Sequence, residues 1–422
     1  MERYNEYKDS SVQWLREIPR HWKEERAKYL YKKEQRPVED GDEIVTCFRD
    51  GEVTLRRNRR TTGFTEATDY SHYQHICKGD LVIHQMDAFA GSSGVSDSDG
   101  MGTPVLSVCT GLTEKTNNYY FAHILRLMGW NGYILSLYRG IRERSSDFRF
   151  DTFSKLWLPL PPLSEQYTIV SYLDDKCAKI DKMLEGKQKQ IELLAEMKQR
   201  IIAETVTRGL DSNVEMKTTN IPWLPEIPEH WKEQRMASLF TGEIEVNKDF
   251  EFKHAFKFNY GQLVPKNEIG DPEEYREVYV KYSKIKSGDI LINGLNLNYD
   301  FVSQRVACAP SDGIITSAYV VCRPRTGVNY DYYTYLFKSM DSMKLFHGMG
   351  TGIRLTLSFK ELKKQIIPIP PQSEQRAIVE FIKCKEAKFD SLTSKLQQEI
   401  ESIKEYKQRL ISDVVTGQIK VC

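Results

Sequence analysis

The sequence lacks the features of a secreted, membrane-embedded or disulfide-stabilised protein. No apolar run in its 422 residues approaches the roughly 18 residues that a membrane-spanning helix needs, and the first residues lack the apolar core of a signal peptide. The eight cysteines are scattered, with no Cys-x-x-Cys pair and no His/Cys cluster at metal-ligand spacing. This pattern favours reduced thiols over disulfides or a zinc site. We therefore expect a cytoplasmic protein that contacts no membrane.

Catalytic motifs are equally scarce. The chain contains neither an Asn-Pro-Pro-aromatic methyltransferase motif nor a phosphate-cradling Gly-x-x-x-x-Gly-Lys loop. Its glycine-rich stretch from His347 to Gly352 lacks the strand-loop-helix pattern and the following acidic residue that mark a dinucleotide site. We predict no catalytic residue, no bound cofactor and no metal site in this chain.

Neither sign of charge dominates, because 60 lysines and arginines face 59 aspartates and glutamates, for a net charge of +1. A nucleic-acid partner needs only a local basic face, however. Two stretches of the sequence supply such a basic face. The candidate DNA contacts are Arg49, Arg56, Arg57, Arg59 and Arg60 in the first stretch and Lys248, Lys253, His254 and Lys257 in the second. The solvated edge of a hairpin is the alternative for either stretch. The arginine cluster gains weight because arginine has the best shape for phosphate and guanine.

The chain repeats itself at an offset of 209 residues. The motif Trp-Leu-x-Glu-Ile-Pro-x-His-Trp begins at Trp14 and again at Trp223, and from Trp14 to Arg26 10 of 13 positions are identical to those 209 later. Between Pro159 and Arg208, 22 of 50 positions match. A period this long indicates duplicated domains rather than the roughly 20 to 50 residues of a solenoid unit. In each copy we expect the Ile-Pro-x-His-Trp segment to be extended and pinned by aromatic burial.

The middle of each copy, residues 26–157 and 235–366, shows short strand patterns and frequent glycine. Lys78-Gly79-Asp80 and Ser287-Gly288-Asp289 each predict a tight turn that leads into a buried strand. After these strands the copies diverge, into His84–Phe89 and Asn293–Asn298. Divergent polar loops on a shared scaffold are expected to carry recognition. These loops contribute five further candidate DNA contacts, which are His84, Gln85, Asn293, Asn296 and Asn298.

Each copy ends in a predicted long helix, which starts at a Pro-Pro-x-Ser-Glu-Gln motif with Ser164 as the expected cap in the first copy. About 45 residues without proline follow, or about 65 Å at roughly 1.5 Å each. Apolar residues recur along both helices, and we expect these stripes to pack on each other as a coiled coil. Such a pair serves as a spacer or as a generic scaffold. The predicted packing residues are Ile169, Leu173, Ile180, Leu184, Ile191, Leu194, Ile201, Ile378, Ile382, Phe389, Leu396, Ile400, Ile403 and Leu410.

Three sets of residues together carry a family resemblance. They are Tyr7-Lys8-Asp9-Ser10 before the first Trp motif, the twin Pro-Pro-x-Ser-Glu-Gln helix starts, and the twin Lys-Gln-Arg helix ends at Lys198 and Lys407. With them the whole chain resembles the specificity subunit of type I restriction-modification systems. The resemblance implies two target-recognition domains, each reading one half of a bipartite double-stranded DNA site, separated by antiparallel helices. It also implies partners that carry the chemistry: two modification (methyltransferase) subunits that bind S-adenosylmethionine and methylate adenine N6, and restriction/translocase subunits that use ATP and Mg²⁺.

We therefore predict an α/β (α+β) chain with a pseudo-twofold internal duplication and two mixed domains. Residues 1–160 form the first target-recognition domain, 161–210 the first long helix, 211–369 the second domain and 370–422 the second long helix. The predicted function is non-catalytic, sequence-specific DNA recognition that positions modification and restriction subunits. The alternatives are a single-chain DNA methyltransferase or nuclease with its own specificity domains, and a coiled-coil scaffold that binds no DNA.

Overall fold

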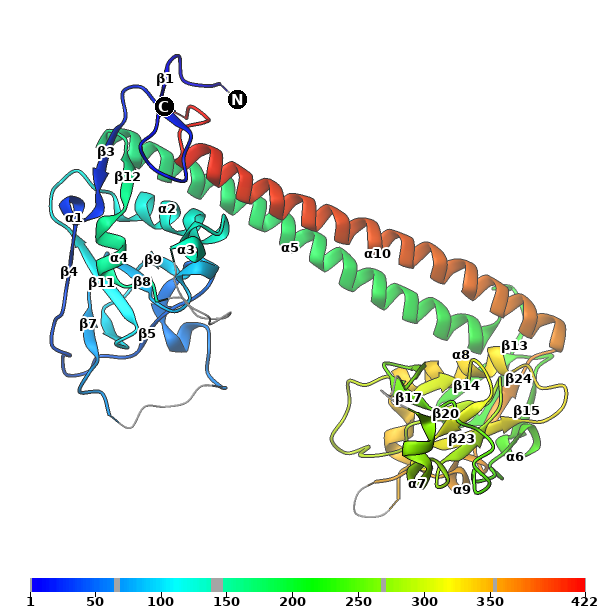
Figure 1. Cartoon of the computed structure of the whole chain (residues 1–422). Helices are drawn as coiled ribbons and strands as arrows, with labels where there is room; N and C mark the ends of the chain where they lie inside the picture. The colour runs from blue at the N-terminus through cyan, green and yellow to red at the C-terminus, as the bar shows by residue number, and fades with distance from the viewer. Residues whose placement is uncertain (1, 64–68, 138–146, 267–270, 352–354, 422) are drawn as a thin grey trace. The chain divides into compact units, whose positions relative to one another are not determined.

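The chain forms two compact units, residues 1–187 with 398–422 and residues 188–397. The computed structural model describes residues 2–63, 69–137, 147–266, 271–351 and 355–421. Each unit holds one mixed domain together with part of each long helix, α5 (Leu163–Arg208) and α10 (Gln372–Val415) (Figure 1). The predicted boundaries separate domains from helices, whereas the compact units divide inside the helices. The reason is that each long helix packs on one domain near its start and on the other near its end.

A four-stranded sheet lies at the centre of each unit. In the first unit the order is β4-β11-β8-β9, with β4 (Tyr31–Lys33), β8 (Leu81–His84), β9 (Ser93–Val95) and β11 (Leu106–Gly111). In the second unit the order is β16-β23-β20-β21, with β16 (Phe240–Thr241), β20 (Ile290–Ile292), β21 (Val306–Cys308) and β23 (Val320–Pro324). The strand pairings in both sheets are antiparallel. The fold is thus α+β, and the matching strand orders confirm the predicted duplication.

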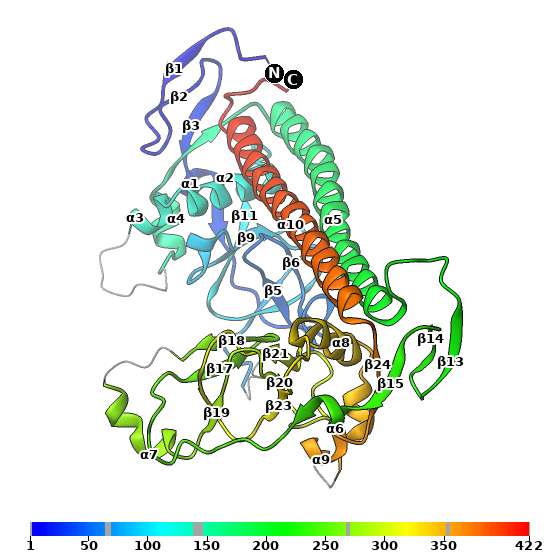
Figure 2. The same ribbon diagram turned by 90° about the vertical axis from the view of Figure 1, so that its right-hand side faces the viewer.

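Smaller elements surround each sheet (Figure 2), and most of them recur in the same order, although η2 has no counterpart in the second unit and η3 with α7 stands where the first unit has η1. In the first unit these are β1 (Tyr7–Asp9), β2 (Glu17–Pro19), β3 (Lys23–Arg26), α1 (Ala27–Leu30), β5 (Val45–Cys47), β6 (Val53–Leu55), η1 (Arg56–Asn58), β7 (Gln74–Ile76), η2 (Ala88–Ala90), β10 (Gly100–Gly102), α2 (Asn118–Trp130), α3 (Tyr133–Ser136), α4 (Phe150–Lys155) and β12 (Trp157–Leu160). In the second unit they are β13 (Met216–Ile221), β14 (Leu224–Pro228), β15 (Lys232–Arg235), α6 (Met236–Leu239), β17 (Phe256–Asn259), β18 (Gln262–Pro265), η3 (Pro272–Tyr275), α7 (Arg276–Tyr279), β19 (Ser283–Ile285), β22 (Gly313–Ile315), α8 (Tyr330–Ser342), η4 (Leu345–Met349), α9 (Phe359–Leu362) and β24 (Ile366–Ile369).

Both faces of each central sheet are covered, which explains the uninterrupted apolar runs after the two Gly-Asp turns. In β8, Leu81 and Ile83 belong to the core that includes α2, whereas Val82 belongs to a second core with the β5–β6 hairpin. In β20, Leu291 likewise lies on the opposite face from its two neighbours. Successive side chains of a strand point to opposite faces. A strand covered on both sides therefore needs an apolar residue at every position.

The helices α5 and α10 run side by side in opposite directions (Figures 1 and 2). In the first unit Nζ of Lys407 lies 2.6 Å from Oδ1 of Asp181, and in the second unit Nζ of Lys198 lies 2.9 Å from Oδ1 of Asp390. Every predicted packing residue is buried or half-buried, and Leu184, Ile191, Leu194 and Leu396 in the middle of the helices are half-buried. There a single partner helix covers the stripe, whereas at the ends a domain covers it as well. Among the described residues, no helix has the length and apolar composition needed to cross a bilayer.

The predicted helix cap is wrong. Because α5 begins at Leu163, Ser164 lies inside the first turn. The backbone N–H of Gln166 donates a 3.0 Å hydrogen bond to the carbonyl of Pro162, so Pro162 itself precedes the first turn. Proline holds its backbone dihedral φ fixed, and the helix therefore starts directly after the Pro-Pro pair.

Candidate nucleic-acid interface

A glutamate at the start of each long helix, buried in the first copy and half-buried in the second, joins the opening Trp motif to that helix. Glu165 of α5 accepts a 3.0 Å hydrogen bond from Nε1 of Trp22 and lies 2.9 Å from Nε2 of His21. Glu374 of α10 makes the same two contacts, 3.0 and 2.8 Å long, with the His-Trp pair of the second copy. Both tryptophan rings are fully buried. The predicted extended segment pinned by a buried aromatic ring is confirmed, and its partner is the glutamate of the Ser-Glu-Gln motif.

A buried tyrosine of each domain donates a hydrogen bond to a backbone carbonyl in the last turn of a long helix. Tyr120 of α2 donates a 2.9 Å hydrogen bond to the carbonyl of Val415 in α10. Tyr332 of α8 donates a 2.8 Å hydrogen bond to the carbonyl of Val206 in α5. Burial raises the pKa of both phenols, so both hydroxyls remain donors at neutral pH. Each domain is thereby fixed to the start of one long helix and to the end of the other.

The two Gly-Asp turns lead into the equivalent strands β8 and β20, and a divergent loop follows each strand. Asp80 accepts the backbone N–H of Cys77 at 2.8 Å, and Asp289 accepts the backbone N–H of Lys286 at 2.8 Å. The glycine before each aspartate has a positive φ, 92° and 86°, which a side chain rarely tolerates. The predicted turns into buried strands are therefore present in both copies. The loops that follow, residues 85–92 and 293–305, differ in length on this common support.

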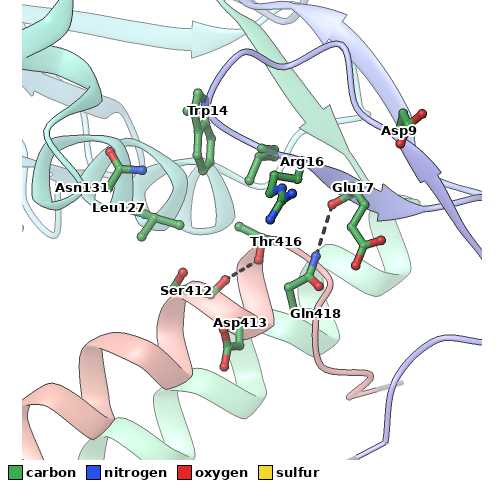
Figure 3. Close-up of a pocket in the computed structure, with 11 residues that line it drawn as sticks. Asp9, Trp14, Arg16, Glu17, Leu127, Asn131, Ser412, Asp413, Thr416 and Gln418 are labelled. Atoms are coloured by element: carbon green, nitrogen blue, oxygen red, sulfur yellow. Dashed lines mark hydrogen bonds between the residues drawn. The ribbon is translucent and has the colours of Figure 1, made fainter.

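A cavity of about 610 Å³ lies in the first unit where the opening segment meets α2 and the end of α10 (Figure 3). Trp14 and Leu127 form apolar parts of its lining, and Arg16, Glu17 and Asp413 form charged parts. The side chain of Gln418 donates a 3.2 Å hydrogen bond to the carbonyl of Glu17 across this region. The lining contains none of the predicted DNA contacts. This cavity belongs to the frame that joins helices and domain, and the recognition loops lie elsewhere.

The first divergent loop packs against the turn between β5 and β6. Arg49 of that turn donates a 2.9 Å hydrogen bond to Asp87, and the backbone N–H of Asp87 donates a 3.1 Å hydrogen bond to Nδ1 of His84. Burial lowers the pKa of His84, so the ring is a neutral acceptor at pH 7. The structure thus brings together Arg49 and His84, which the sequence offered as separate candidates. Gln85 instead turns toward β11, with its amide nitrogen 3.3 Å from Oγ of Ser107.

Carboxylates neutralise much of the predicted arginine cluster. The ion pairs are Arg49 with Asp87 at 2.9 Å, Arg57 with Glu43 at 2.6 Å, and Arg59 with Asp50 at 2.7 Å and Glu52 at 2.8 Å. Arg56 is half-buried in η1, and Arg60 donates to the carbonyl of Gly63. A phosphate would compete with these carboxylates for each paired guanidinium. This edge is therefore less positive than its arginine count predicts.

The second divergent loop is organised by a buried arginine that sequence reasoning missed. The Arg305 side chain has no exposed surface. Its Nη1 donates to the carbonyls of Asn293 at 3.0 Å and Leu295 at 2.8 Å, and its Nη2 donates to those of Asn296 at 3.4 Å and Asp300 at 2.6 Å. One guanidinium thus holds four backbone carbonyls of the loop from inside. An arginine placed directly before the apolar strand Val306–Cys308 is the sequence signal that could have revealed it.

The surface of this loop is more apolar than predicted. Tyr299 is 81% exposed and Val302 is 92% exposed. The ring of Phe301 stacks on His347 with 4.6 Å between centroids. At the tip of the β17–β18 hairpin, Tyr260 is 82% exposed. Exposed apolar groups that gather on one surface mark interaction sites, and aromatic faces are good platforms for bases.

The predicted asparagines of this loop contribute mainly to its shape. Asn296 is exposed and adopts a positive φ of 52°, which asparagine tolerates better than most residues. Asn293 and Asn298 are half-buried, and the side chain of Asn293 accepts the backbone N–H of Leu295 at 3.2 Å. Of the three asparagines, Asn296 has the side chain most accessible to a ligand.

The predicted cations of the second unit lie beside a different cluster. Lys253 forms a 2.9 Å ion pair with Glu273 and lies 5.2 Å above the Phe250 ring. His254 packs edge-to-face on Phe256, with 4.6 Å between ring centroids. Lys248 and Lys257 are exposed. The second unit therefore offers two candidate surfaces, this cation-rich one and the loop held by Arg305.

Comparison with known proteins gives concordant matches. Residues 247–402 match the family described as "Type I restriction modification DNA specificity domain". The chain is 25% identical over 291 residues to the type I restriction enzyme MjaVIII specificity subunit of Methanocaldococcus jannaschii, an alignment that covers 64% of this chain and 63% of that protein. It is 23% identical over 330 residues to the type I restriction enzyme EcoBI specificity subunit of Escherichia coli, covering 72% of this chain and 66% of that protein.

Two solved structures share the fold. A chain from a study of complex assembly and conformational transition of the type I R-M system superposes with a TM-score of 0.67 at 16% identity, covering 95% of this chain and 99% of that chain. The HsdS subunit from Thermoanaerobacter tengcongensis superposes with a TM-score of 0.54 at 15% identity, covering 96% and 99%. Together with the duplicated frame and the paired long helices, these matches show that the chain is similar to the specificity subunits of type I restriction-modification systems.

Proposed function

We propose that this chain is the DNA-recognition subunit of a type I restriction-modification complex and that it reads a bipartite, asymmetric site in double-stranded DNA. The observation that carries the proposal is one frame, present twice, that supports two unlike loops after the equivalent strands β8 and β20. A shared frame gives both loops the same local setting. Different loops then read different half-sites.

The physical requirements of duplex recognition support this proposal. Two readers about one turn of B-DNA apart, roughly 34 Å, can share one face of the duplex. In the first unit, the guanidinium of Arg49 and the imidazole of His84 both contact Asp87 of the divergent loop. In the second, the loop held by Arg305 presents exposed Tyr299 and Asn296. Guanidinium and amide groups suit base edges in the major groove.

We further propose that other subunits carry the chemistry. Two modification subunits would bind S-adenosylmethionine and methylate adenine, and restriction/translocase subunits would use ATP and Mg²⁺. This chain would bind neither cofactor and would work in the cytoplasm without membrane contact. The pair of α5 and α10 would act as the spacer that sets the gap between the half-sites.

The test is to purify the chain alone and together with the modification subunits of its own system. Binding to a duplex that carries the methylated motif and methyl transfer to that duplex are then measured for both preparations. We expect methyl transfer only when both kinds of subunit are present. Methylation or cleavage by the chain alone would identify it as an enzyme. Failure of the complex to distinguish its motif from random duplex would reduce the chain to a scaffold.

A further inference from the structure

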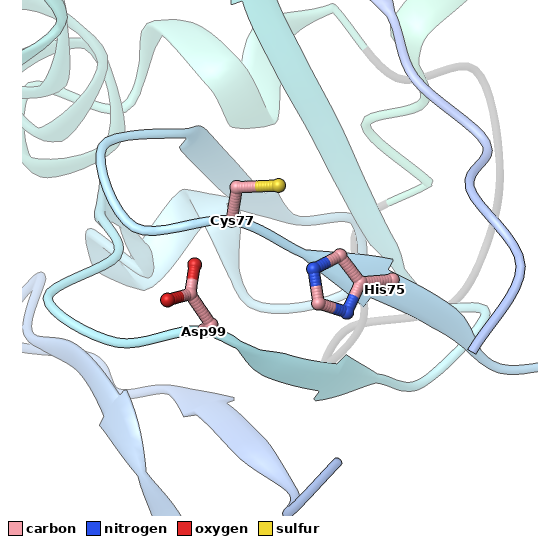
Figure 4. A group of neighbouring side chains, drawn as sticks. All are labelled: His75, Cys77 and Asp99. Carbon is pink, nitrogen blue, oxygen red and sulfur yellow. The ribbon is translucent and has the colours of Figure 1, made fainter. Parts of the chain in front are cut away.

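Three side chains of the first unit that can bind a metal ion lie close together, although no metal site was predicted. One donor atom each from His75, Cys77 and Asp99 lies within 4.8 Å of the others (Figure 4). His75 belongs to β7, and Cys77, two residues after His75, directly follows that strand, so they project to the same side of the chain. Asp99 directly precedes β10, which pairs with β7. Sequence spacing missed the site because the third donor is distant in the chain.

The surroundings of His75 are those of a metal-binding imidazole. Its Nδ1 lies 2.9 Å from Oδ2 and 3.1 Å from Oδ1 of Asp42, and both side chains are 8% exposed. A carboxylate on Nδ1 leaves Nε2 as the free ring nitrogen. Metal-ligating histidines almost always have such a carboxylate or carbonyl on the second nitrogen, since it fixes the tautomer and the ring orientation. Glu39 adds a further oxygen 4.0 Å from Nε2.

The second copy shows that the corresponding corner holds a positive charge. The residues 209 positions after His75 and Cys77 are Lys284 and Lys286. Nζ of Lys284 lies 2.6 Å from Glu251 and 3.8 Å from Glu245. The aspartate before the paired strand is kept, because Asp312 accepts the N–H of Ser287 at 2.8 Å as Asp99 accepts that of Lys78 at 2.8 Å. An ammonium group thus balances the carboxylates in the second unit, where the first unit has an imidazole and a thiol.

We propose that His75, Cys77 and Asp99 bind one divalent metal ion of the zinc class in the first unit. The ligands are Nε2 of His75, Sγ of Cys77 and Oδ2 of Asp99, while Oδ1 of Asp99 keeps its hydrogen bond to Lys78. Glu39 or a water molecule completes a four-coordinate site. A thiol and an imidazole select zinc-like ions over Mg²⁺ and Ca²⁺, which take oxygen ligands.

Binding requires a small closure and the loss of one proton. Zn²⁺ bonds of about 2.0 to 2.3 Å place neighbouring tetrahedral ligands roughly 3.3 to 3.8 Å apart, so the donors must approach by about 1 Å. The exposed side chain of Asp99 can supply this movement by rotation. Burial raises the pKa of the Cys77 thiol, and the metal replaces its proton, which leaves to solvent. The bound ion would join the turn at residues 39–42 to the β7–β10 pair.

Cobalt binding by the full-length chain tests the proposal, because Co²⁺ replaces Zn²⁺ and reports sulfur ligation by colour. The chain is stripped with a chelator and titrated with Co²⁺, and Zn²⁺ is then added. We expect one equivalent of Co²⁺ per chain, a thiolate-to-cobalt charge-transfer band in the near ultraviolet, and loss of that band when Zn²⁺ displaces Co²⁺. The variant C77S should lose the band, and D99N should bind at least 10-fold more weakly. The control C384S, which removes the exposed cysteine of α10, should bind as the wild type does.

The outcomes decide between a built site and incidental thiol binding. No charge-transfer band in the wild type, a band that survives in C77S, or a band lost in C384S would each overturn the proposal. Because Asp99 is exposed and asparagine can still accept the N–H of Lys78, D99N should fold even if C77S does not. An unchanged affinity in D99N would therefore also refute the three-ligand site. None of these measurements depends on DNA recognition.

Discussion

Replacing Arg305 by lysine should impair reading of the second half-site and leave the first intact. The guanidinium bonds four carbonyls of the loop from two nitrogens, whereas a lysine ammonium offers three donors on a single atom. Hydrogen bonds to charged groups contribute about 1.5 to 3 kcal/mol each. Because the three lysine donors share one nitrogen, we expect at most two of the four carbonyls to be bonded, and the loss of two bonds would cost about 3 kcal/mol or more, which is roughly 100-fold in the equilibrium between ordered and open loop.

The effect on DNA binding follows from the fraction of chains with an ordered loop. Affinity falls in proportion to the binding-competent fraction, so we expect a loss of up to about 100-fold for the complete site. The assay measures binding of the chain with its modification subunits to three duplexes: one intact, one with the first half-site randomised and one with the second randomised. In R305K the loss of affinity caused by randomising the second half-site should be smaller than in the wild type, while the loss caused by randomising the first half-site should be unchanged.

A matched arginine of the same domain supplies the control. Arg323 bonds Asp289 at 2.8 Å in the Gly-Asp turn and makes none of the carbonyl bonds that hold the loop. R323K therefore reports on general weakening of the second domain. If R305K discriminates both halves as the wild type does, or if R323K relaxes the second half equally, Arg305 does not organise the loop for DNA reading.

Three further predictions concern the frame, the spacer and the arginine cluster. E165Q removes charge-assisted hydrogen bonds worth about 2 kcal/mol and should lower the calorimetric Tm of its unit by roughly 4 to 8 °C. E374Q should lower the Tm less, because the Glu374 side chain is already 22% exposed. Equal stability of both variants and the wild type would refute the role given to these glutamates. Four residues inserted after Glu192 and four after Lys395 each add roughly 6 Å and turn the helix by about 40°, so the methylated motif should keep both halves with a gap one or two base pairs longer. Two-residue insertions rotate the apolar stripe by about 200° and should abolish activity. An active four-residue variant with an unchanged gap would show that the helices are only a tether. Changing to alanine the four arginines Arg56, Arg57, Arg59 and Arg60 should flatten the log-log salt dependence of DNA binding by about 0.9 per lost phosphate contact, and an unchanged slope would mark the cluster as a solvated edge.

The frame was predictable because the sequence contains it twice. The recurrence of His-Trp and Ser-Glu-Gln pointed to a common structural role, and the Glu165–Trp22 hydrogen bond supplies it. The two Gly-Asp turns and the long helices were predictable for local reasons, since positive φ favours glycine and apolar residues repeat along each helix. The cap at Ser164 was mispredicted because the Pro-Pro pair starts the helix earlier.

The candidate recognition surfaces were predictable only in outline. Divergence between the copies located both loops, but the bonds that shape them join residues far apart in the chain, such as Arg49 with Asp87. The positive charge of the arginine cluster was overestimated because ion pairs such as Arg57 with Glu43 depend on side-chain placement. Arg305 was missed for a similar reason: a buried charge becomes visible only when the carbonyls around it are known.

Exchange of one domain tests directly whether the two domains read separate half-sites. Residues 26–157 are replaced by the equivalent segment of a relative with a different site, and the methylated motif of cells that carry the hybrid with its modification subunits is sequenced. We expect one half of the motif to change to that of the relative, while the other half and the gap remain. A hybrid that is active but changes both halves, or neither, would contradict it.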